Sequence, residues 1–227
     1  MSPRRTALAV MRKDLRIEWN SRILVNQVAP FAAIVMVLFA FALDNDGILQ
    51  RVAPGLVWLA TLFSMLVVIQ RSFAVESADG ALDALRVAGV DPAAIFAGKS
   101  MALFLQLVAL ESVLVATAVV LYGVTLTGTG LLLAVCTVLV ATIGLACVGT
   151  LYGGLAAGVR GRETLLPLLI LPVVAPVLIG ATRATEAAFG SGGADVSEGW
   201  PWLALLAVFA MVFAMVGSMA FGPLVDE

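Results

Sequence analysis

The sequence contains no histidine, and its only cysteines are Cys136 and Cys147. The absence of histidine removes imidazole ligands for a metal ion and the commonest general base of enzymes. The two cysteines are eleven residues apart. This is roughly 16 Å along one helix, which is too far for a disulfide between them. We therefore expect two free thiols that pack as small apolar residues.

Charged residues are also scarce. They make up 12% of the chain, whereas hydrophobic residues make up 62% and the mean hydropathy is +1.08. Soluble proteins contain about 25% charged residues, so a water-soluble domain is excluded. The formal net charge of −2 leaves no positive excess that could hold a nucleic acid. We expect membrane lipid around the chain and no nucleic-acid partner.

Six segments are long enough to cross a bilayer, which takes about 20 apolar residues. Glu111 is the single charged residue between 100 and 159, and a stretch with three glycines at 122–130 divides that region into two spans. We therefore predict an all-α integral membrane protein with one domain of six transmembrane helices over residues 23–222. The spans are predicted at about 23–43, 52–70, 100–122, 131–158, 164–182 and 200–222.

The distribution of lysine and arginine predicts how these helices are oriented. Eleven of the thirteen basic residues lie in residues 1–22, 71–99 and 160–162, on one side of the predicted bundle, and only Arg51 and Arg183 lie on the other. Basic residues accumulate on the cytoplasmic side of membrane proteins. We therefore expect both termini in the cytoplasm.

Residues 1–22 carry an amphipathic pattern ahead of the first span. Apolar residues recur every three or four positions, at Leu8, Met11, Leu15 and Trp19. Charged residues occupy the other side of the same helix, and this pattern predicts a helix on the cytoplasmic surface of the membrane. The alternative is a basic tail whose only role is to fix the orientation of the chain.

The segment between the second and third spans, residues 71–99, is the most structured polar part of the sequence. Asp79 can cap a short helix that places Leu82 and Leu85 on one face. A helix of two turns has little stability of its own, so we expect it to dock onto another subunit. A solvated loop helix is the alternative.

Residues 93–100 nearly match a phosphate-binding loop, with Ala93 in the position of the first glycine. Such a loop connects a strand to a helix of an α/β domain, whereas this stretch leads directly into a predicted span. We therefore expect no catalytic residues, no metal site and no ATP hydrolysis by this chain alone. Lys99 is interpreted as an anchor whose ammonium reaches the membrane surface.

Three features inside the spans are further candidates. Glu111 lies midway along the third span, where a carboxyl is costly unless it faces the bundle interior. A role with a substrate or protons and a hydrogen bond between helices both remain open for it. Gly149 and Gly153 allow close helix approach, within one subunit or between two. Pro172 and Pro176 remove backbone hydrogen bonds from the fifth span and favour a bend.

Three stretches of the chain carry more specific motifs. Residues 50–58 read Gln-Arg-Val-Ala-Pro-Gly-Leu-Val-Trp at the entry to the second span. Residues 71–99 contain Arg-Ser-Phe at their start and Asp-Gly-Ala-Leu-Asp-Ala-Leu at 79–85, and residues 168–179 form a proline-bearing apolar run. Together these stretches resemble the CcmB permeases of cytochrome c maturation. Length, number of spans and orientation also agree, so the resemblance covers nearly the whole chain.

The resemblance implies a membrane subunit of an ABC-type complex for c-type cytochrome biogenesis in the bacterial inner membrane. It implies a homodimer that pairs with the ATPase CcmA, which binds the ATP, and works with CcmC, CcmD and the haem chaperone CcmE. Export of haem and ATP-driven release of haem-loaded CcmE are both compatible with it, and no covalent cofactor is expected. The alternatives are an exporter of a lipid, drug or polysaccharide, and a proton-coupled secondary transporter that uses Glu111.

The resemblance also assigns roles to particular residues. Transmission of movement from the ATPase is implied for Glu76, Asp79, Gly80, Leu82, Asp83, Leu85 and Arg86. A structural role is implied for the motif residues of the second and fifth spans, which are Arg51, Pro54, Gly55, Trp58, Pro172 and Pro176. Glu111 lies outside the resembling stretches, so the resemblance assigns it no role.

Overall fold

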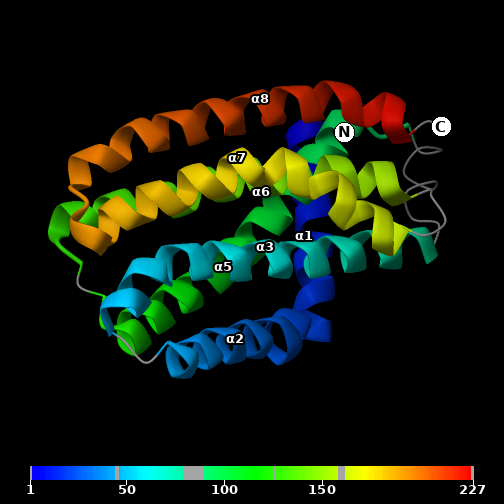
Figure 1. The fold of residues 1–227 in the computed structure, drawn as a ribbon. Coiled ribbons are helices and arrows are strands. Elements are labelled where there is room, and N and C mark those ends of the chain that lie inside the picture. Colours follow the sequence, from blue (N-terminus) through cyan, green and yellow to red (C-terminus); the bar gives the residue numbers. More distant parts are fainter. Residues whose placement is uncertain (1, 44–45, 79–88, 125, 158–161, 226–227) are drawn as a thin grey trace.

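The computed structural model describes residues 2–43, 46–78, 89–124, 126–157 and 162–225, and within them every regular element is a helix (Figure 1). The α-helices are α1 (Pro3–Ser21), α2 (Ala29–Ala42), α3 (Asp46–Ala78), α5 (Pro92–Tyr122), α6 (Gly128–Ala157), α7 (Arg162–Phe189) and α8 (Gly199–Val225). A short π-helix, η1 (Leu24–Val28), precedes α2, and two 3₁₀ turns, η2 (Ser191–Gly193) and η3 (Val196–Glu198), precede α8.

Six helical segments are long and apolar enough to cross a membrane, which confirms the predicted all-α fold with six spans. They are Leu24–Ala42, Gly47–Ala74, Pro92–Tyr122, Gly128–Ala156, Leu165–Phe189 and Val196–Pro223. Some helices extend beyond the uncharged runs in the sequence. For example, α3 begins at Asp46 and ends at Ala78. Charged residues fit at the ends of such helices because long side chains can reach the membrane surface.

Most of the long helices run alongside one another, and α1 lies across them near one end (Figure 1). The first and last described residues are both found toward this end. We call it the α1 end and the other the opposite end. α3 ends, and α5 begins, at the α1 end, so the helices that precede and follow residues 79–88 in the sequence are both found there.

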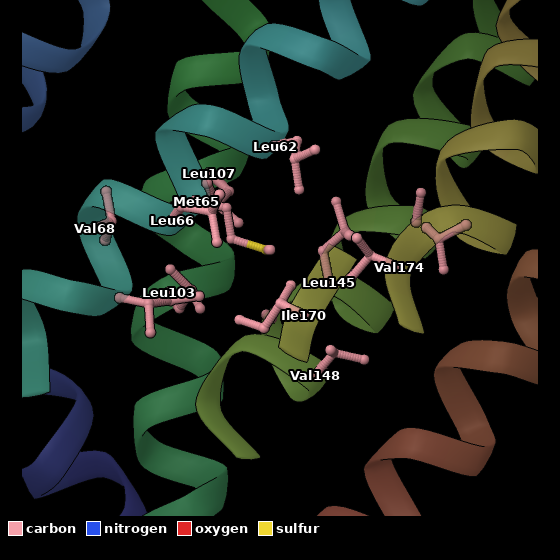
Figure 2. Packing of buried hydrophobic residues seen from close by; sticks show 14 of the residues in the cluster. Leu62, Met65, Leu66, Val68, Leu103, Leu107, Leu145, Val148, Ile170 and Val174 are labelled. Atoms are coloured by element: carbon pink, nitrogen blue, oxygen red, sulfur yellow. The ribbon is translucent and has the colours of Figure 1, made fainter. Parts of the chain in front are cut away.

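The core of the bundle lies among α3, α5, α6 and α7. Met65, Leu107, Leu145 and Ile170 are completely buried, and Figure 2 shows the residues of this cluster directed toward one another. Many leucines, valines and methionines on the outer faces are exposed instead. Because lipid is as apolar as these side chains, helices in a membrane associate through close packing rather than through burial from water.

Gly149 and Gly153 of α6 show this close packing. A Cβ atom at Gly149 would collide with Ile69, and one at Gly153 would collide with Phe73, both on α3. The bare glycine backbone therefore lets α3 and α6 approach each other. Of the two alternatives left open by the sequence, the structure shows packing within one subunit for this glycine pair.

The stretch that nearly matches a phosphate-binding loop, residues 93–100, is continuous helix at the start of α5. Pro92 occupies the first turn, and the Asp91 carboxylate accepts a hydrogen bond of 3.0 Å from the Ala93 N–H. These are the usual start signals of a helix, in which the later backbone N–H groups are bonded internally. The stretch is therefore not a phosphate-binding loop.

Both cysteines lie on α6 as free thiols, as predicted. Cys147 is buried in an apolar cluster with Phe96 and Phe221, and Cys136 is half-buried. Burial raises the cost of forming a thiolate, so these side chains pack as small apolar groups.

Candidate functional site

A buried ion pair joins α1 to α5 at the α1 end. Lys99 Nζ lies 3.3 Å from Asp14 Oδ2, and the two side chains are only 2% and 8% exposed. The ammonium also lies 4.5 Å from the centre of the Phe73 ring and 3.5 Å from Ser72 Oγ, both on α3. One lysine therefore connects three helices. We call these four residues the Lys99 cluster.

The burial of Lys99 corrects the expectation that its ammonium reaches the membrane surface. Gly98 allows α1 to lie directly on α5, since a Cβ there would be 2.6 Å from Ala7 O and 2.7 Å from Val10 Cβ. At this distance α1 covers Lys99. A buried lysine requires a counter-charge, and Asp14 provides it.

The predicted amphipathic helix of residues 1–22 is present as α1. Its apolar stripe is partly exposed: Leu8 is 48% and Trp19 79% exposed, whereas Met11 and Leu15 are half-buried. A second face, which includes Val10 and Asp14, is buried against the protein. Sequence reasoning missed this second face because it lacks a run of large apolar residues and includes the charged residue Asp14.

The structure ties together the helices that flank the predicted coupling segment. The Lys99 cluster contacts α3 shortly before its end and α5 shortly after its start. Glu76 lies near the end of α3. The other residues with an assigned coupling role lie outside the described residues, and their role stays a prediction: Asp79, Gly80, Leu82, Asp83, Leu85 and Arg86.

The motif that enters the second span packs α3 against α7 near the opposite end. The indole Nε1 of Trp58, which is 1% exposed, donates a hydrogen bond of 2.9 Å to Thr185 Oγ1 on α7. Pro54 is buried, and a Cβ at Gly55 would lie 3.9 Å from the Thr182 methyl on α7. These three motif residues therefore lie where α3 packs against other helices of the bundle.

The start of the same motif lies at the surface. The Gln50 carbonyl accepts a hydrogen bond of 3.0 Å from Ser191 Oγ, and Gln50 Nε2 donates one of 3.2 Å to the Gly123 carbonyl. Arg51 is exposed and lines an open recess of about 820 Å³ together with Arg183. Arg51 therefore differs from the rest of the motif, because it contributes charge to the surface rather than packing.

Trp58→Phe should lower the free energy of unfolding by about 1–2 kcal/mol, because the buried Thr185 hydroxyl loses its indole donor. Thermal denaturation in detergent measures the change. Trp200→Phe is the matched control, since Trp200 lies in the first turn of α8 and is 43% exposed. Equal unfolding temperatures for the two variants would show that the hydrogen bond between Trp58 and Thr185 does not stabilise the fold.

Pro172 and Pro176 lie on the exposed face of α7. Val174 and Val177 of the same helix face the core. The structure therefore does not bring the two prolines into contact with the buried polar groups of the interior. The missing proline N–H groups leave the carbonyls one turn earlier without their usual helical donors.

Glu111 is completely buried in the middle of α5. Thr142 Oγ1 on α6 lies 2.5 Å from Glu111 Oε2, and Thr61 on α3 interacts with the same carboxyl. Oε1 has no hydrogen-bond partner in the described part of the chain. The side chain thus faces the bundle interior as predicted, and the structure shows a hydrogen bond between helices.

These features define a class of protein, a helical membrane protein whose buried polar contacts hold its spans together. In the described ranges, no group of three His, Cys, Asp or Glu side chains could hold a metal ion. The buried polar side chains of the described residues are mostly threonines and serines within the spans, together with Glu111, Lys99 and Asp14.

The family follows from comparison with known proteins. Residues 5–226 match the family described as "CcmB protein". The chain is 30% identical over 218 residues to "Heme exporter protein B" of Haemophilus influenzae, covering 95% of this chain and 93% of that protein. It is 28% identical over 215 residues to the protein of the same name from Paracoccus denitrificans, covering 93% and 96%. The chain belongs to the CcmB family.

Membership confirms the function that the resemblance implied, a membrane permease subunit in cytochrome c maturation. The six spans and the bacterial relatives place the chain in the bacterial inner membrane. It is a transport subunit rather than an enzyme. The family match favours this function over an exporter of another substrate and over a proton-coupled transporter.

Proposed function

We propose that this chain converts ATP hydrolysis by a separate subunit, CcmA, into movement of its own transmembrane helices. The observation that supports this proposal is the Lys99 cluster. Residues 79–88 lie between α3 and α5, and Lys99 links both helices to each other and to α1. Force applied to this segment by a docked ATPase would therefore act on three helices together.

The proposed orientation places the α1 end in the cytoplasm, where the ATPase is. Eleven of the thirteen basic residues belong to segments predicted on that side, and the first and last described residues lie toward the same end (Figure 1). A cytoplasmic α1 would lie along the inner leaflet, with the exposed part of its apolar stripe in contact with lipid.

The proposed assembly contains two copies of this chain and two of CcmA, and works with CcmC, CcmD and the haem chaperone CcmE. The relatives are named for the export of haem, which supports haem as the substrate of the complex. ATP-driven release of haem-loaded CcmE would serve the same pathway. This chain contains no histidine, which fits a subunit that leaves haem ligation to its partners and holds no cofactor of its own.

Substitution of Leu82 and Leu85 by Asp in one variant tests the coupling proposal. If these leucines form the apolar face of a docking helix, as predicted, charges there should reduce recovery of CcmA in a detergent pull-down by about tenfold or more, because a charge buried without a partner is strongly unfavourable. Membrane insertion should be unchanged. Ala194→Asp, at the opposite end, is the control and should retain CcmA.

Two results would contradict the proposal. The first is normal recovery of CcmA with the double variant, together with normal maturation of cytochromes c. The second is recovery of the wild-type chain with an ATPase but without CcmC or haem-loaded CcmE, which would support an exporter of another substrate.

A further inference from the structure

An apolar groove opens where the end of α1 meets η1 and α5. Its volume is about 550 Å³. Small-molecule sites usually range from about 300 to 1,000 Å³. Leu15 and Trp19 form one wall, Leu24 of η1 forms a second, and Leu105 and Ala109 of α5 form the third.

The acidic residues of α1 are already engaged in contacts within the protein. The Glu18 carboxylate borders the groove, and its Oε1 accepts a hydrogen bond of 2.5 Å from the Leu24 N–H. Asp14 forms the buried ion pair with Lys99. Neither carboxylate forms an ion pair with an arginine of this helix.

Those arginines remain exposed. In the described part of the chain no carboxylate pairs with Arg4, Arg5, Arg12, Arg16 or Arg22. Arg22 lies at the groove itself, where it ends α1 in a left-handed conformation with φ of 51°. An apolar groove thus lies beside an exposed guanidinium that forms no ion pair with the described carboxylates, and the Glu18 carboxylate at the groove is bonded to the Leu24 N–H instead.

We propose that this groove binds an anionic phospholipid from the leaflet at the α1 end, with an acyl chain along the apolar walls and the phosphate beside Arg22. A ligand must be apolar over most of its length and negatively charged at one end to fit these walls and this arginine. Basic pockets next to membrane helices bind anionic headgroups in this way. Trp19 at the wall of the groove is 79% exposed, and tryptophan is enriched where a protein meets the membrane surface.

The backbone at this place is also unusual. Leu24 begins a π-helix, η1, that connects the crossing helix to the first span. Such segments are rare and occur frequently at functional sites. The proposal concerns a site outside the ATPase-coupling segment, so it stands whether or not the proposed coupling is correct.

Quenching of Trp19 fluorescence by brominated lipid tests this proposal. The full-length chain is reconstituted into vesicles of three parts phosphatidylcholine to one part phosphatidylglycerol. In the test vesicles the phosphatidylglycerol is brominated. In the reference vesicles one part of the phosphatidylcholine is brominated instead. The contribution of Trp19 is the difference between the wild type and Trp19→Phe. We expect brominated phosphatidylglycerol to quench this contribution at least about threefold more efficiently than brominated phosphatidylcholine at the same mole fraction.

Two pairs of variants locate the site. Arg22→Asn removes the charge with a residue that tolerates the left-handed conformation, and it should abolish the preference for phosphatidylglycerol. Arg5→Asn removes an equal charge far from the groove and should retain it. Ala109→Phe fills the groove and should abolish the preference, whereas Ala116→Phe, exposed on the same helix but outside the groove, should retain it.

Three results would overturn the proposal. Equal quenching by the two brominated lipids in the wild-type protein would show that the groove has no preference for negative charge. An equal effect of Arg5→Asn and Arg22→Asn would show only general attraction to the membrane. Weak quenching by both lipids, with Trp19 emission that changes with the protein-to-lipid ratio, would show that a second copy of the chain occupies the groove.

Discussion

Lys99→Met is expected to lower the free energy of unfolding by about 3–5 kcal/mol, because it removes the buried counter-charge of a buried carboxylate. Asp14 is only 8% exposed, and the counter-charge that remains is Lys13, whose side chain is 37% exposed. The contact of the ammonium with the Phe73 ring is lost as well. Unfolding of the purified chain in detergent, followed by circular dichroism, measures the change.

Lys13→Met is the matched control for this experiment. Lys13 Nζ lies 3.2 Å from the same aspartate, but its side chain is 37% exposed. An exposed ion pair contributes about 0–1 kcal/mol, so this variant should unfold nearly as the wild type does. An equal loss of stability in the two methionine variants would show that the buried Lys99 contributes no more to the free energy of unfolding than the exposed Lys13.

A double variant separates folding from coupling. Asp14→Leu combined with Lys99→Met replaces the ion pair with apolar side chains, and such replacements are often neutral or stabilising. We expect the double variant to regain most of the stability that Lys99→Met loses. Cytochrome c maturation by a stable double variant would then show whether the ion pair transmits movement or serves folding alone.

The spans were predictable because hydropathy over about 20 residues depends on composition alone. The ends of the helices were less predictable. α3 continues to Ala78 although the uncharged run ends at Gln70, since helical hydrogen bonds do not require apolar side chains. A run of uncharged residues marks the part of a helix inside the hydrocarbon layer and not the whole helix.

The polar contacts could not be predicted from local patterns, because their partners are far apart in the sequence. Lys99 and Asp14 are 85 residues apart, and Trp58 and Thr185 are 127 apart. The sequence indicated that Glu111 faces the interior, since a carboxyl in lipid is costly. It did not indicate that Thr142 is the partner, because several threonines on the same span were equally suitable.

Three buried polar contacts in the described part of the chain join different sets of helices. Lys99 joins α1, α3 and α5 at the α1 end, Glu111 joins α5 to α6 in the middle, and Trp58 joins α3 to α7 near the opposite end. In a membrane such contacts supplement van der Waals packing between helices. α3 and α5, which flank residues 79–88, are therefore connected to neighbouring helices at more than one point along their length. Movement of these two helices would be passed to their neighbours through these contacts.

The hydrogen bonds around Glu111 indicate that its carboxyl is neutral. Thr142 Oγ1 lies 2.5 Å from Glu111 Oε2 and 2.5 Å from the Val138 carbonyl. A hydroxyl has one hydrogen, so it cannot donate fully to both oxygens. Both contacts are satisfied when Thr142 donates to Val138 and a protonated Glu111 supplies the hydrogen between the two side chains. An ionised carboxylate without a cation would be far more costly at this depth.

Glu111→Ala should therefore lower the free energy of unfolding by about 2–4 kcal/mol, since it leaves a cavity and removes the link between α5 and α6. Glu111→Gln is the matched variant, because its amide is neutral, has nearly the same shape and can donate to Thr142. We expect Glu111→Gln to unfold within about 1 kcal/mol of the wild type and to support cytochrome c maturation. A Gln variant that is stable but inactive would show instead that the carboxyl must ionise during transport, as a proton-coupled mechanism requires.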